Sequence, residues 1–386
     1  MGKKKILIIN TKYREFGGED SNILDEIKFL EKYFEVDYLA YDNNEKLKII
    51  DYVSFFTLNN KKSNSLFLEK IKKFNPDLVY VNNTWFKANL GIFDILKDLN
   101  IKTILKIHNF RYDCTRHIFS KKHFNNQPYC KKCGAKSKKF QIINKYFSDS
   151  YLKSLAVLIY GQKYFKILKT YPITIFTLNS FHKDMLVRAG VNEKKIMTYY
   201  NPIINNIIQN SPDFSNKDEV IYAGRLSEEK GVKELLESWT KANTKDLVLK
   251  IIGIGELYDY LKHKYSSNNI IFTGFNNQSE TLKTIRNSRA VITTTKIYEG
   301  QPRLLCEASS FGVPSIFPKF GGVNEYYPND YIFSFEQYDY NDLNKKIELL
   351  HDDELVATEG QRAYKFLNEL IREEEMINTF EKLIEH

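Results

Sequence analysis

The chain has 386 residues, of which 42% are hydrophobic and 14% aromatic, so it can fill a large core and is not an intrinsically disordered protein. Its length favours two domains over one, and no run of about 18 apolar residues is present, which argues against a membrane-spanning helix. The formal net charge of +9 indicates either attraction to membranes, phosphates or nucleic acid, or only the Lys-, Asn- and Ile-rich composition of an AT-rich genome, and without a recognisable nucleic-acid-binding module we expect no nucleic acid partner.

Three lysines near the start of the chain, at positions 3–5, precede a short apolar run, Ile6–Ile9. This run is too short for the apolar part of a signal peptide, and charged residues follow it soon. We therefore interpret it as the first buried strand and expect a cytoplasmic protein.

Short apolar runs alternate with amphipathic stretches in the first half, which is typical of parallel α/β folds. Asn179 or Ser180 is expected to cap a helix after the last of these runs. The expected helical stretches include Ser21–Tyr33 and Ser65–Phe74. The expected strands are Lys5–Ile9, Val36–Leu39, Leu78–Val81, Thr103–Ile107 and Ile173–Thr177.

The same pattern starts again after the polar stretch Gln209–Asp218, with a helix from Val232 and a charged helical segment over Asn341–Glu385. We therefore expect an α/β fold of two Rossmann-like domains, residues 1–200 and 201–365, that face each other across a cleft, and a helix over 366–386 that crosses back to the first domain. The second set of strands is Val220–Ala223, Leu249–Ile252, Ile270–Thr273, Ala290–Thr293 and Val313–Phe317.

Two glutamates, Glu299 and Glu307, lie on a loop that leads into a helix. Pro302 suits the first helical position and Gly312 suits the helix end, so Glu299 lies outside the helix and Glu307 about five residues inside it. The free backbone N–H groups of the first turn then form an anion site flanked by two carboxylates. Such a site suits a nucleotide sugar, which carries both phosphates and hydroxyls.

Two further loops that follow predicted strands carry groups able to bind phosphate. Arg225 and Lys230 belong to the sequence GRLSEEKG, which places a guanidinium and an ammonium at the same strand end; the alternative is a pair of solvated surface cations. Gly17 and Gly18 follow the first strand and would let the backbone approach a ligand closely, although a simple turn explains them as well.

Four motifs appear in a characteristic order: GRLSEEKG, the turn at Gly253, FTGF at 272–275 and YEGQPRLLCEA at 298–308. With them, nearly the whole chain resembles the retaining glycosyltransferase family 4, which has the two-domain GT-B fold. The resemblance implies an acceptor-binding first domain, a nucleotide-sugar-binding second domain and transfer of a hexose or N-acetylhexosamine from a nucleotide-diphosphate donor. Bacterial relatives build capsule, O-antigen or other surface glycans, so the implied acceptor is a glycan, lipid-linked by preference.

The resemblance also implies roles for individual residues. Arg225 and Lys230 resemble the pair that grips the donor pyrophosphate, and Glu307 resembles the carboxylate that binds the ribose hydroxyls. Glu299 resembles the acidic residue beside the transferred sugar. His108 resembles the first-domain histidine that faces this sugar, with a polar residue at the rim of the core as its alternative. The candidate catalytic residues are His108, Glu299, Arg225 and Lys230, and the further donor-binding candidates are Gly17, Gly18, Gly253, Phe275, Gly300, Gln301, Pro302, Arg303 and Leu304.

The expected mechanism requires no metal ion or other cofactor. The sequence contains no Asp-x-Asp triplet, and Arg225, Lys230 and a helix N-terminus can stabilise the leaving diphosphate. Retention through two displacements would need a carboxylate nucleophile. The family lacks an agreed one, so we favour front-face attack with the leaving phosphate as base and do not assign Glu299 as a nucleophile.

Three cysteines, Cys114, Cys130 and Cys133, lie in a basic insertion over 111–139. Their spacing leaves two interpretations open, a structural zinc site completed by His117, His123 or water, or reduced thiols without metal. Cys306, in the helix of the glutamate pair, is expected to be a buried small side chain.

Two questions of function remain open in the sequence. The stretch Lys131–Lys169 alternates lysines with aromatic and aliphatic residues, which indicates either contact with an anionic membrane surface or an amphipathic helix with its lysines in solvent. A nucleotide-sugar 2-epimerase of the same fold and a non-catalytic nucleotide-sugar-binding subunit are the alternatives to a transferase.

Overall fold

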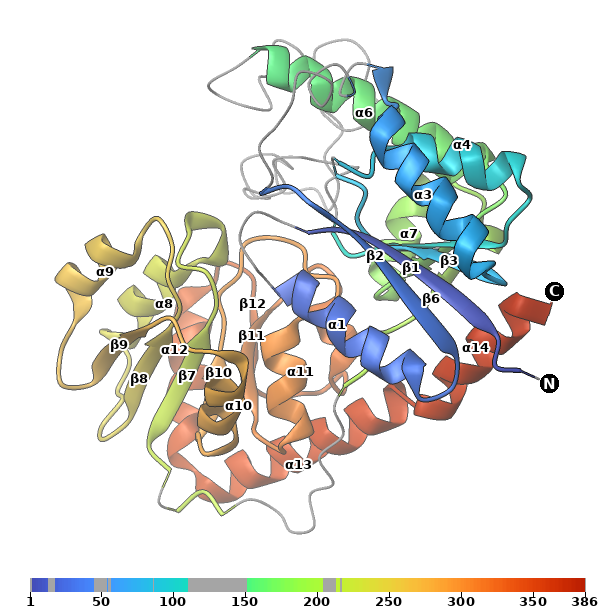
Figure 1. The fold of residues 1–386 in the computed structure, drawn as a ribbon. Helices are drawn as coiled ribbons and strands as arrows, with labels where there is room; N and C mark the ends of the chain where they lie inside the picture. The colour runs from blue at the N-terminus through green and yellow to red at the C-terminus, as the bar shows by residue number, and fades with distance from the viewer. Residues whose placement is uncertain are drawn as a thin grey trace. The chain divides into compact units, whose positions relative to one another are not determined.

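The structure is a computed structural model that forms two compact units (Figure 1). Unit 1 comprises the described residues up to Pro202 together with the C-terminal segment from Glu373, and unit 2 comprises those from Ile203 to Arg372. The chain thus passes from unit 1 to unit 2 after Pro202 and returns after Arg372. The described residues are 2–12, 18–44, 54, 57–85, 87–109, 151–203, 213–215 and 217–385, with the side chains of 151–154 and 156–158 left out.

Unit 1 is built on a six-stranded sheet with the order β2-β1-β3-β4-β5-β6, in which all neighbouring strands are parallel. Its strands are β1 (Lys5–Lys12), β2 (Glu35–Asp42), β3 (Leu78–Val81), β4 (Thr103–Ile107), β5 (Thr174–Thr177) and β6 (Ile196–Thr198). Its helices are α1 (Gly18–Glu31), α3 (Lys61–Phe74), α4 (Gly91–Asp98), α6 (Tyr151–Thr170), α7 (Ser180–Arg188), the 3₁₀ helix η2 (Glu193–Lys195) and α14 (Glu373–Glu385).

Helices cover both faces of this sheet, with α3, α4 and α6 on one side and α1 and α14 on the other (Figure 1). Because side chains alternate between the faces of a strand, Leu105 and Ile107 of β4 join the core cluster under α3 and α4. Lys106 lies between them in sequence and points to the α1 side, where it pairs with Glu26 of α1 at 2.9 Å. The α1 side of the sheet therefore carries a buried ion pair.

Unit 2 has a second parallel sheet of six strands, in the order β12-β11-β10-β7-β8-β9. Its strands are β7 (Glu219–Ala223), β8 (Val248–Ile252), β9 (Ile270–Gly274), β10 (Ala290–Ile292), β11 (Ser315–Lys319) and β12 (Ser334–Glu336). Its helices are η3 (Glu228–Lys230), α8 (Val232–Trp239), α9 (Tyr258–Tyr265), α10 (Gln278–Arg286), α11 (Arg303–Ser310), η4 (Val323–Tyr326), α12 (Tyr340–Glu348), η5 (Leu349–His351) and α13 (Asp353–Leu370).

Two parallel sheets with helices between their strands confirm the predicted α/β class, and each predicted strand is present within three residues of its predicted ends. The predicted cap of α7 is confirmed at Asn179, whose side chain accepts from the backbone N–H of His182. The predicted start of the glutamate-pair helix was wrong by one residue. Pro302 is the N-cap, with an extended ψ of 99°, so α11 begins at Arg303 instead. Gly312 follows the helix with a φ of +65°, as its predicted role requires.

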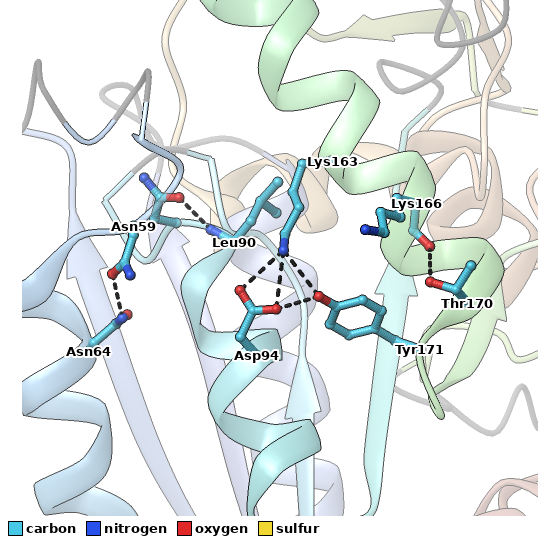
Figure 2. A network of polar contacts seen from close by, with 9 residues as sticks. Asn59, Asn64, Leu90, Asp94, Lys163, Lys166, Thr170 and Tyr171 are labelled. Carbon is cyan, nitrogen blue, oxygen red and sulfur yellow. Dashed lines mark hydrogen bonds and ion pairs between the residues drawn. The ribbon is translucent and has the colours of Figure 1, made fainter.

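Helix α6 is attached to α4 by a polar contact (Figure 2). The Nζ of Lys163 lies 3.1 Å from both carboxylate oxygens of Asp94 and 3.0 Å from the hydroxyl of Tyr171, which also donates to Asp94. The same part of α6 contributes three buried side chains to the core, Phe165, Ile167 and Leu168. This part of the stretch Lys131–Lys169 is thus a helix packed on unit 1, and residues 110–150 lie outside the described residues. None of the described helices is long and apolar enough to span a bilayer.

Candidate functional site

The strand order of unit 2 reverses at β7, which lies between β8 and β10. In open parallel sheets, ligands bind at the carboxyl ends of the strands that flank such a reversal. The segment after β7 is Gly224–Gly231 and the segment after β10 is Thr293–Pro302. Most of the predicted donor-binding residues of the second half therefore follow the two strands at which the topology predicts a ligand.

Lys230 and Glu299 meet at this reversal point. The Nζ of Lys230 lies 2.6 Å from Oε1 of Glu299, and the hydroxyl of Thr295 donates to the same oxygen at 3.1 Å. Both charged side chains are only partly buried, at 30% and 22% exposed. The two residues that the sequence assigned to phosphate and to sugar thus form an ion pair with each other, at a place where a ligand can reach both.

Backbone contacts hold the two segments together. The N–H of Lys296 donates to the carbonyl of Glu229 at 2.9 Å, and the Thr294 hydroxyl donates to the carbonyl of Gly231 at 2.7 Å. Gly231 has a φ of +69°, and a Cβ on it would lie 2.1 Å from the Thr294 carbonyl oxygen. Only glycine fits this conformation and this approach, so the glycine that ends GRLSEEKG fixes Lys230 beside Glu299.

Arg225 stands at the other end of the same segment. Its backbone carbonyl accepts from the hydroxyl of Tyr222, a buried side chain whose pKa is raised mainly by burial. The Arg225 side chain itself is exposed, and within the described part of the chain its guanidinium makes no hydrogen bond or ion pair. A fixed backbone and an uncommitted guanidinium are what an external anion requires.

The turn at Gly253 packs directly on this segment. Gly253 has a φ of +135°, and a Cβ there would lie 2.0 Å from the carbonyl oxygen of Gly224. Its neighbour Ile254 accepts from the N–H of Leu226 at 3.0 Å. Gly253 therefore acts by letting the loop after β8 touch the loop after β7, and this contact positions Arg225.

Two large apolar side chains are exposed at the adjacent strand ends. Phe275 follows β9 and is 72% exposed, and Ile254 follows β8 and is 55% exposed. Exposed aromatic and aliphatic faces beside two cationic side chains suit the flat surface of a nucleobase. Phe275 was a predicted donor-binding residue, whereas Ile254 was not; its signal in the sequence is an apolar residue between two glycines.

Helix α11 supplies the remaining predicted residues. Its first turn contains no acidic residue, so its positive N-terminal end is not neutralised from within that turn. Arg303, the first residue, donates from Nε to Oε1 of Glu307 at 2.7 Å, one helical turn later. Cys306 is buried as predicted, and burial raises the pKa of its thiol. The predicted residues Gly300, Gln301, Pro302 and Leu304 lie at the entry to this helix.

His108 belongs to unit 1, directly after β4. Its Nε2 lies 2.7 Å from Oδ1 of Asn82, the residue that follows β3. Burial, and then the electrostatic influence of Lys106 and His182, hold the pKa of His108 well below its usual value of 6.5. The imidazole is therefore neutral, with one nitrogen as donor and the other as acceptor.

The buried ion pair beneath His108 was not predicted. Lys106 and Glu26 are both almost fully buried, and the hydroxyl of Tyr80 also donates to Glu26 at 2.8 Å. Burial lowers the pKa of Lys106, and Glu26 opposes this effect. A lone charged residue in an apolar strand was the signal in the sequence, but its partner lies 80 residues away in the chain.

Several predicted residues cannot be placed. Gly18 is the first residue of α1, whereas Gly17 and the three cysteines Cys114, Cys130 and Cys133 lie outside the described residues. Over the described part of the chain, no group of three or more His, Cys, Asp or Glu side chains could hold a metal ion. The structural zinc site stays a prediction, which metal analysis of the purified protein tests.

Known proteins resemble this chain in both sequence and structure. Residues 204–366 match the family model described as glycosyl transferases group 1. A lipopolysaccharide 1,6-galactosyltransferase of Salmonella typhimurium is 28% identical over 156 residues, which cover 38% of this chain and 43% of that protein. An uncharacterized glycosyltransferase of Methanocaldococcus jannaschii is 26% identical over 313 residues, 75% of this chain and 70% of that protein. The chain thus spans less than half the length of the first of these relatives.

Solved structures match over the whole chain. HepE of Anabaena in complex with UDP and glucose has a TM-score of 0.69 at 16% identity, with 99% of each chain covered. Sucrose-phosphate synthase from Thermosynechococcus elongatus has a TM-score of 0.70 at 15% identity, covering 99% of this chain and 98% of that one. Identities this low show the fold alone, and the predicted GT-B type of fold is confirmed.

Proposed function

We propose, from the match of residues 204–366 to the family model of glycosyl transferases group 1, that this chain is a retaining glycosyltransferase. It moves a hexose or N-acetylhexosamine from a nucleotide-diphosphate sugar to a glycan acceptor. We also propose that the protein belongs to glycosyltransferase family 4 and that it takes part in the synthesis of surface glycans.

A single observation carries the proposal, namely the set of groups at the strand reversal of unit 2. Lys230 and Glu299 are paired at 2.6 Å, and the exposed Arg225 and the N-terminus of α11 follow the same two strands, β7 and β10. Two cations and a helix N-terminus suit a diphosphate, and a carboxylate suits a sugar hydroxyl. A nucleotide sugar contains both groups within one ligand.

The cationic groups act on the leaving group. When the bond between the anomeric carbon and the phosphate oxygen breaks, negative charge develops on the diphosphate. In this proposal Arg225 contacts the phosphate oxygens, and Lys230 moves from Glu299 to the phosphate or bridges the two. The oxygen freed on Glu299 then accepts from a hydroxyl of the transferred sugar. No step in this account requires a metal ion.

Retention follows if the acceptor attacks the face that the diphosphate leaves. The acceptor oxygen forms a bond to the anomeric carbon on that face, and its proton passes to the departing phosphate oxygen. We assign no nucleophilic role to Glu299, because in this proposal its carboxylate accepts from a hydroxyl of the transferred sugar. The HepE complexes with UDP and UDP-glucose support a uridine nucleotide as the first donor to test.

The acceptor is proposed to be lipid-linked, in line with the lipopolysaccharide enzyme that this chain is similar to. A lipid-linked acceptor would bring the protein to the cytoplasmic face of a membrane, where its net charge of +9 favours anionic lipids. Sedimentation with vesicles of neutral lipid, and with vesicles that contain anionic lipid, tests this contact; equal binding to both would contradict it.

The experiment for the activity begins with a thermal-shift panel of UDP-, GDP- and ADP-linked sugars. Donors that stabilise the protein are then incubated with it, with and without EDTA, and the products are analysed by NMR. A sugar product with the donor's anomeric configuration, formed equally with EDTA, supports the proposal. An epimerised donor, or binding without turnover, would favour one of the two alternative functions. An inverted product would exclude retention.

A further inference from the structure

Three neighbouring strands of unit 1 place polar side chains on the same face of the sheet. Ile9 of β1 pairs with Val81 of β3, so the next residues, Asn10 and Asn82, are neighbours. Val81 also pairs with Leu105 of β4, which places Lys106 beside Asn82 and His108 two residues further along. Because side chains alternate, all four residues point to the α1 side. This arrangement of the four side chains follows from the strand register and not from the family motifs.

Three atoms of this set are buried and have no hydrogen-bond partner among the described residues: Oδ1 of Asn10, Nδ2 of Asn82 and Nδ1 of His108. The two asparagines are 1% and 5% exposed. Buried polar atoms in native proteins are nearly always satisfied, because leaving one unsatisfied costs free energy. Three such atoms at adjacent strand ends indicate a ligand that completes them.

The contact between Asn82 and His108 bears on which ring nitrogen of His108 is available as a hydrogen-bond acceptor. A neutral imidazole donates from one nitrogen and accepts at the other. Asn82 presents its carbonyl oxygen Oδ1 to Nε2 of His108 at 2.7 Å. With the amide of Asn82 in this orientation, the contact fits the tautomer that carries its proton on Nε2 and leaves Nδ1 as the free acceptor.

We propose that Asn82 is a positioning residue that fixes the Nε2–H tautomer of His108, and that Asn10, Asn82 and His108 together read the hydroxyls of a sugar. Resting on the proposed function, the inference adds Asn10 and Asn82 to the sugar-binding residues. The set offers two acceptors and one donor. A hydroxyl can both donate and accept, whereas a phosphate oxygen can only accept and would be repelled by two of the three atoms. The subsite therefore takes a neutral polyol.

Other groups surround this set. The hydroxyl of Tyr38, on β2, contacts the side chain of Asn10. Lys106 on β4 and His182 on α7 act electrostatically on His108. Glu26 of α1 pairs with Lys106. The contact of Tyr38 with Asn10 and that of Asn82 with His108 each orient one member of the set, as a recognition site requires.

The first test is NMR of protein labelled with ¹⁵N-histidine, with the His108 signal assigned from the variant His108→Gln. We expect the Nε2–H tautomer in the wild type. Asn82→Asp keeps the acceptor and adds a negative charge, so it should raise the pKa of His108. The matched control is Asn60→Ala, a buried asparagine that caps α3 on the opposite side of the sheet. It should leave the His108 signal unchanged. An Nδ1–H tautomer in the wild type would overturn the positioning role.

The second test is binding of UDP, UDP-glucose and UDP-galactose, and of methyl glucoside and methyl galactoside in the presence of UDP. Asn82→Ala should weaken binding of a sugar-containing probe by about tenfold, the scale of a lost hydrogen bond, with UDP binding unchanged. A loss confined to UDP-sugars assigns the subsite to the donor, and one confined to methyl glycosides assigns it to the acceptor. If Asn82→Ala also weakened the binding of UDP without a sugar, the hydroxyl-reading role would be overturned. An equal loss of sugar binding in the Asn60→Ala control would overturn it as well.

The tautomer measurement and the binding measurement together separate this inference from the proposed function. Wild-type protein that shows the Nε2–H tautomer but binds none of the probes would overturn both the hydroxyl-reading role and the proposed donor class. The positioning role of Asn82 would then stand on the NMR result alone. Wild-type protein that binds a UDP-sugar while Asn82→Ala binds it equally well would overturn the hydroxyl-reading role only.

Discussion

Glu307 is proposed to bind the ribose hydroxyls, yet its carboxylate already accepts from Arg303 at 2.7 Å. The two statements are compatible, because an ionised carboxylate can accept at about four positions. Arg303 lies one turn earlier on the same helix, so the ion pair orients the carboxylate without filling it. Arg303, which was itself a predicted donor-binding residue, thus acts here by orienting Glu307.

Replacing Glu307 with alanine should weaken binding of the donor by about 1–3 kcal/mol, because two ribose hydroxyls lose a charged acceptor. Isothermal titration calorimetry with the donor found in the panel measures this change. The matched control is Glu237→Ala, which removes a carboxylate from another i,i+4 ion pair of unit 2, with Lys233 on α8. Equal donor affinity in wild type and Glu307→Ala would contradict the ribose role.

The two buried histidines of unit 1 should make stability depend on pH. Burial lowers the pKa of His182 to about 3 and holds that of His108 well below 6.5. The folded protein keeps both rings neutral, whereas the unfolded chain protonates them near pH 6.5, so the unfolded state binds more protons in acid. The free energy of unfolding should fall by roughly 1.4 kcal/mol per histidine between about pH 7.5 and about pH 5.5.

Urea unfolding at the two pH values measures this loss. His182→Gln removes one of the two groups and should reduce the pH-dependent loss by about half. His263→Gln, on the exposed surface of α9, is the control and should leave it unchanged. A loss that is the same in all three proteins would mean that other groups dominate the acid sensitivity.

At the scale of elements, the proposed donor site depends on loops that touch each other through glycine. The loop after β7 packs on the loop after β8 at Gly253 and on the loop after β10 at Gly231. Hydrogen bonds at 3.0 Å and 2.9 Å connect their backbones. The position of Arg225 and Lys230 is therefore a property of three strand ends and not of their own motif alone.

Gly253→Ala tests this dependence. The added Cβ would lie 2.0 Å from the Gly224 carbonyl oxygen, and φ is +135°, so the loops must separate. We expect a loss of stability of about 1–3 kcal/mol together with weaker donor binding. Gly161→Ala is the matched control, because a Cβ there meets nothing within 4 Å in α6. It should be neutral or gain up to about 1 kcal/mol. Normal donor binding by Gly253→Ala would show that the contact is dispensable.

The elements also show what the sequence could predict. The ends of β3 and β4 were predicted without error, because each is an apolar run bounded by polar residues. β6 and β12 were missed: each has three residues, and each contains an exposed one. Short strands of mixed burial give no periodic signal, and only their pairing with a neighbour defines them.

The candidate site was predictable to a similar degree. The residue types in GRLSEEKG and around the glutamate pair indicated phosphate and hydroxyl binding. Which groups pair was not predictable, because the contact of Lys230 with Glu299 joins positions 69 residues apart. The contact of His108 with Asn82 likewise depends on the order of β3 and β4 in the sheet. Pairings of this kind follow from strand register, which one sequence does not contain.

At the scale of the whole molecule, the chain enters unit 2 at Ile203 and returns to unit 1 at Glu373. The sequence placed these boundaries at 201 and 366. Helix α13 ends within unit 2 at Leu370, and α14 completes unit 1. Unit 1 thus depends on a segment that is synthesised only after unit 2.

Phe380 of α14 shows how large this dependence is. Its ring is fully buried, with its centroid 5.3 Å from that of Tyr80 and 5.4 Å from that of Tyr199. These two tyrosines surround the ion pair beneath His108: Tyr80 donates to Glu26, and Lys106 lies over the ring of Tyr199. The last helix of the chain therefore closes the buried polar groups of the first unit.

Phe380→Ala should destabilise unit 1 by about 3–5 kcal/mol, the usual cost of removing a buried phenyl ring, and leave unit 2 unchanged. The two tryptophans make this measurable, because Trp85 belongs to unit 1 and Trp239 to unit 2. In urea unfolding followed by fluorescence, the variant Trp239→Phe keeps only Trp85 and reports on unit 1. The variant Trp85→Phe keeps only Trp239 and reports on unit 2. The Trp85 transition should move to lower urea in Phe380→Ala, while the exposed control Glu374→Ala moves neither transition. Equal movement of both transitions would instead mean that the two units unfold as one, since a local loss in unit 1 can reach Trp239 only through cooperative unfolding.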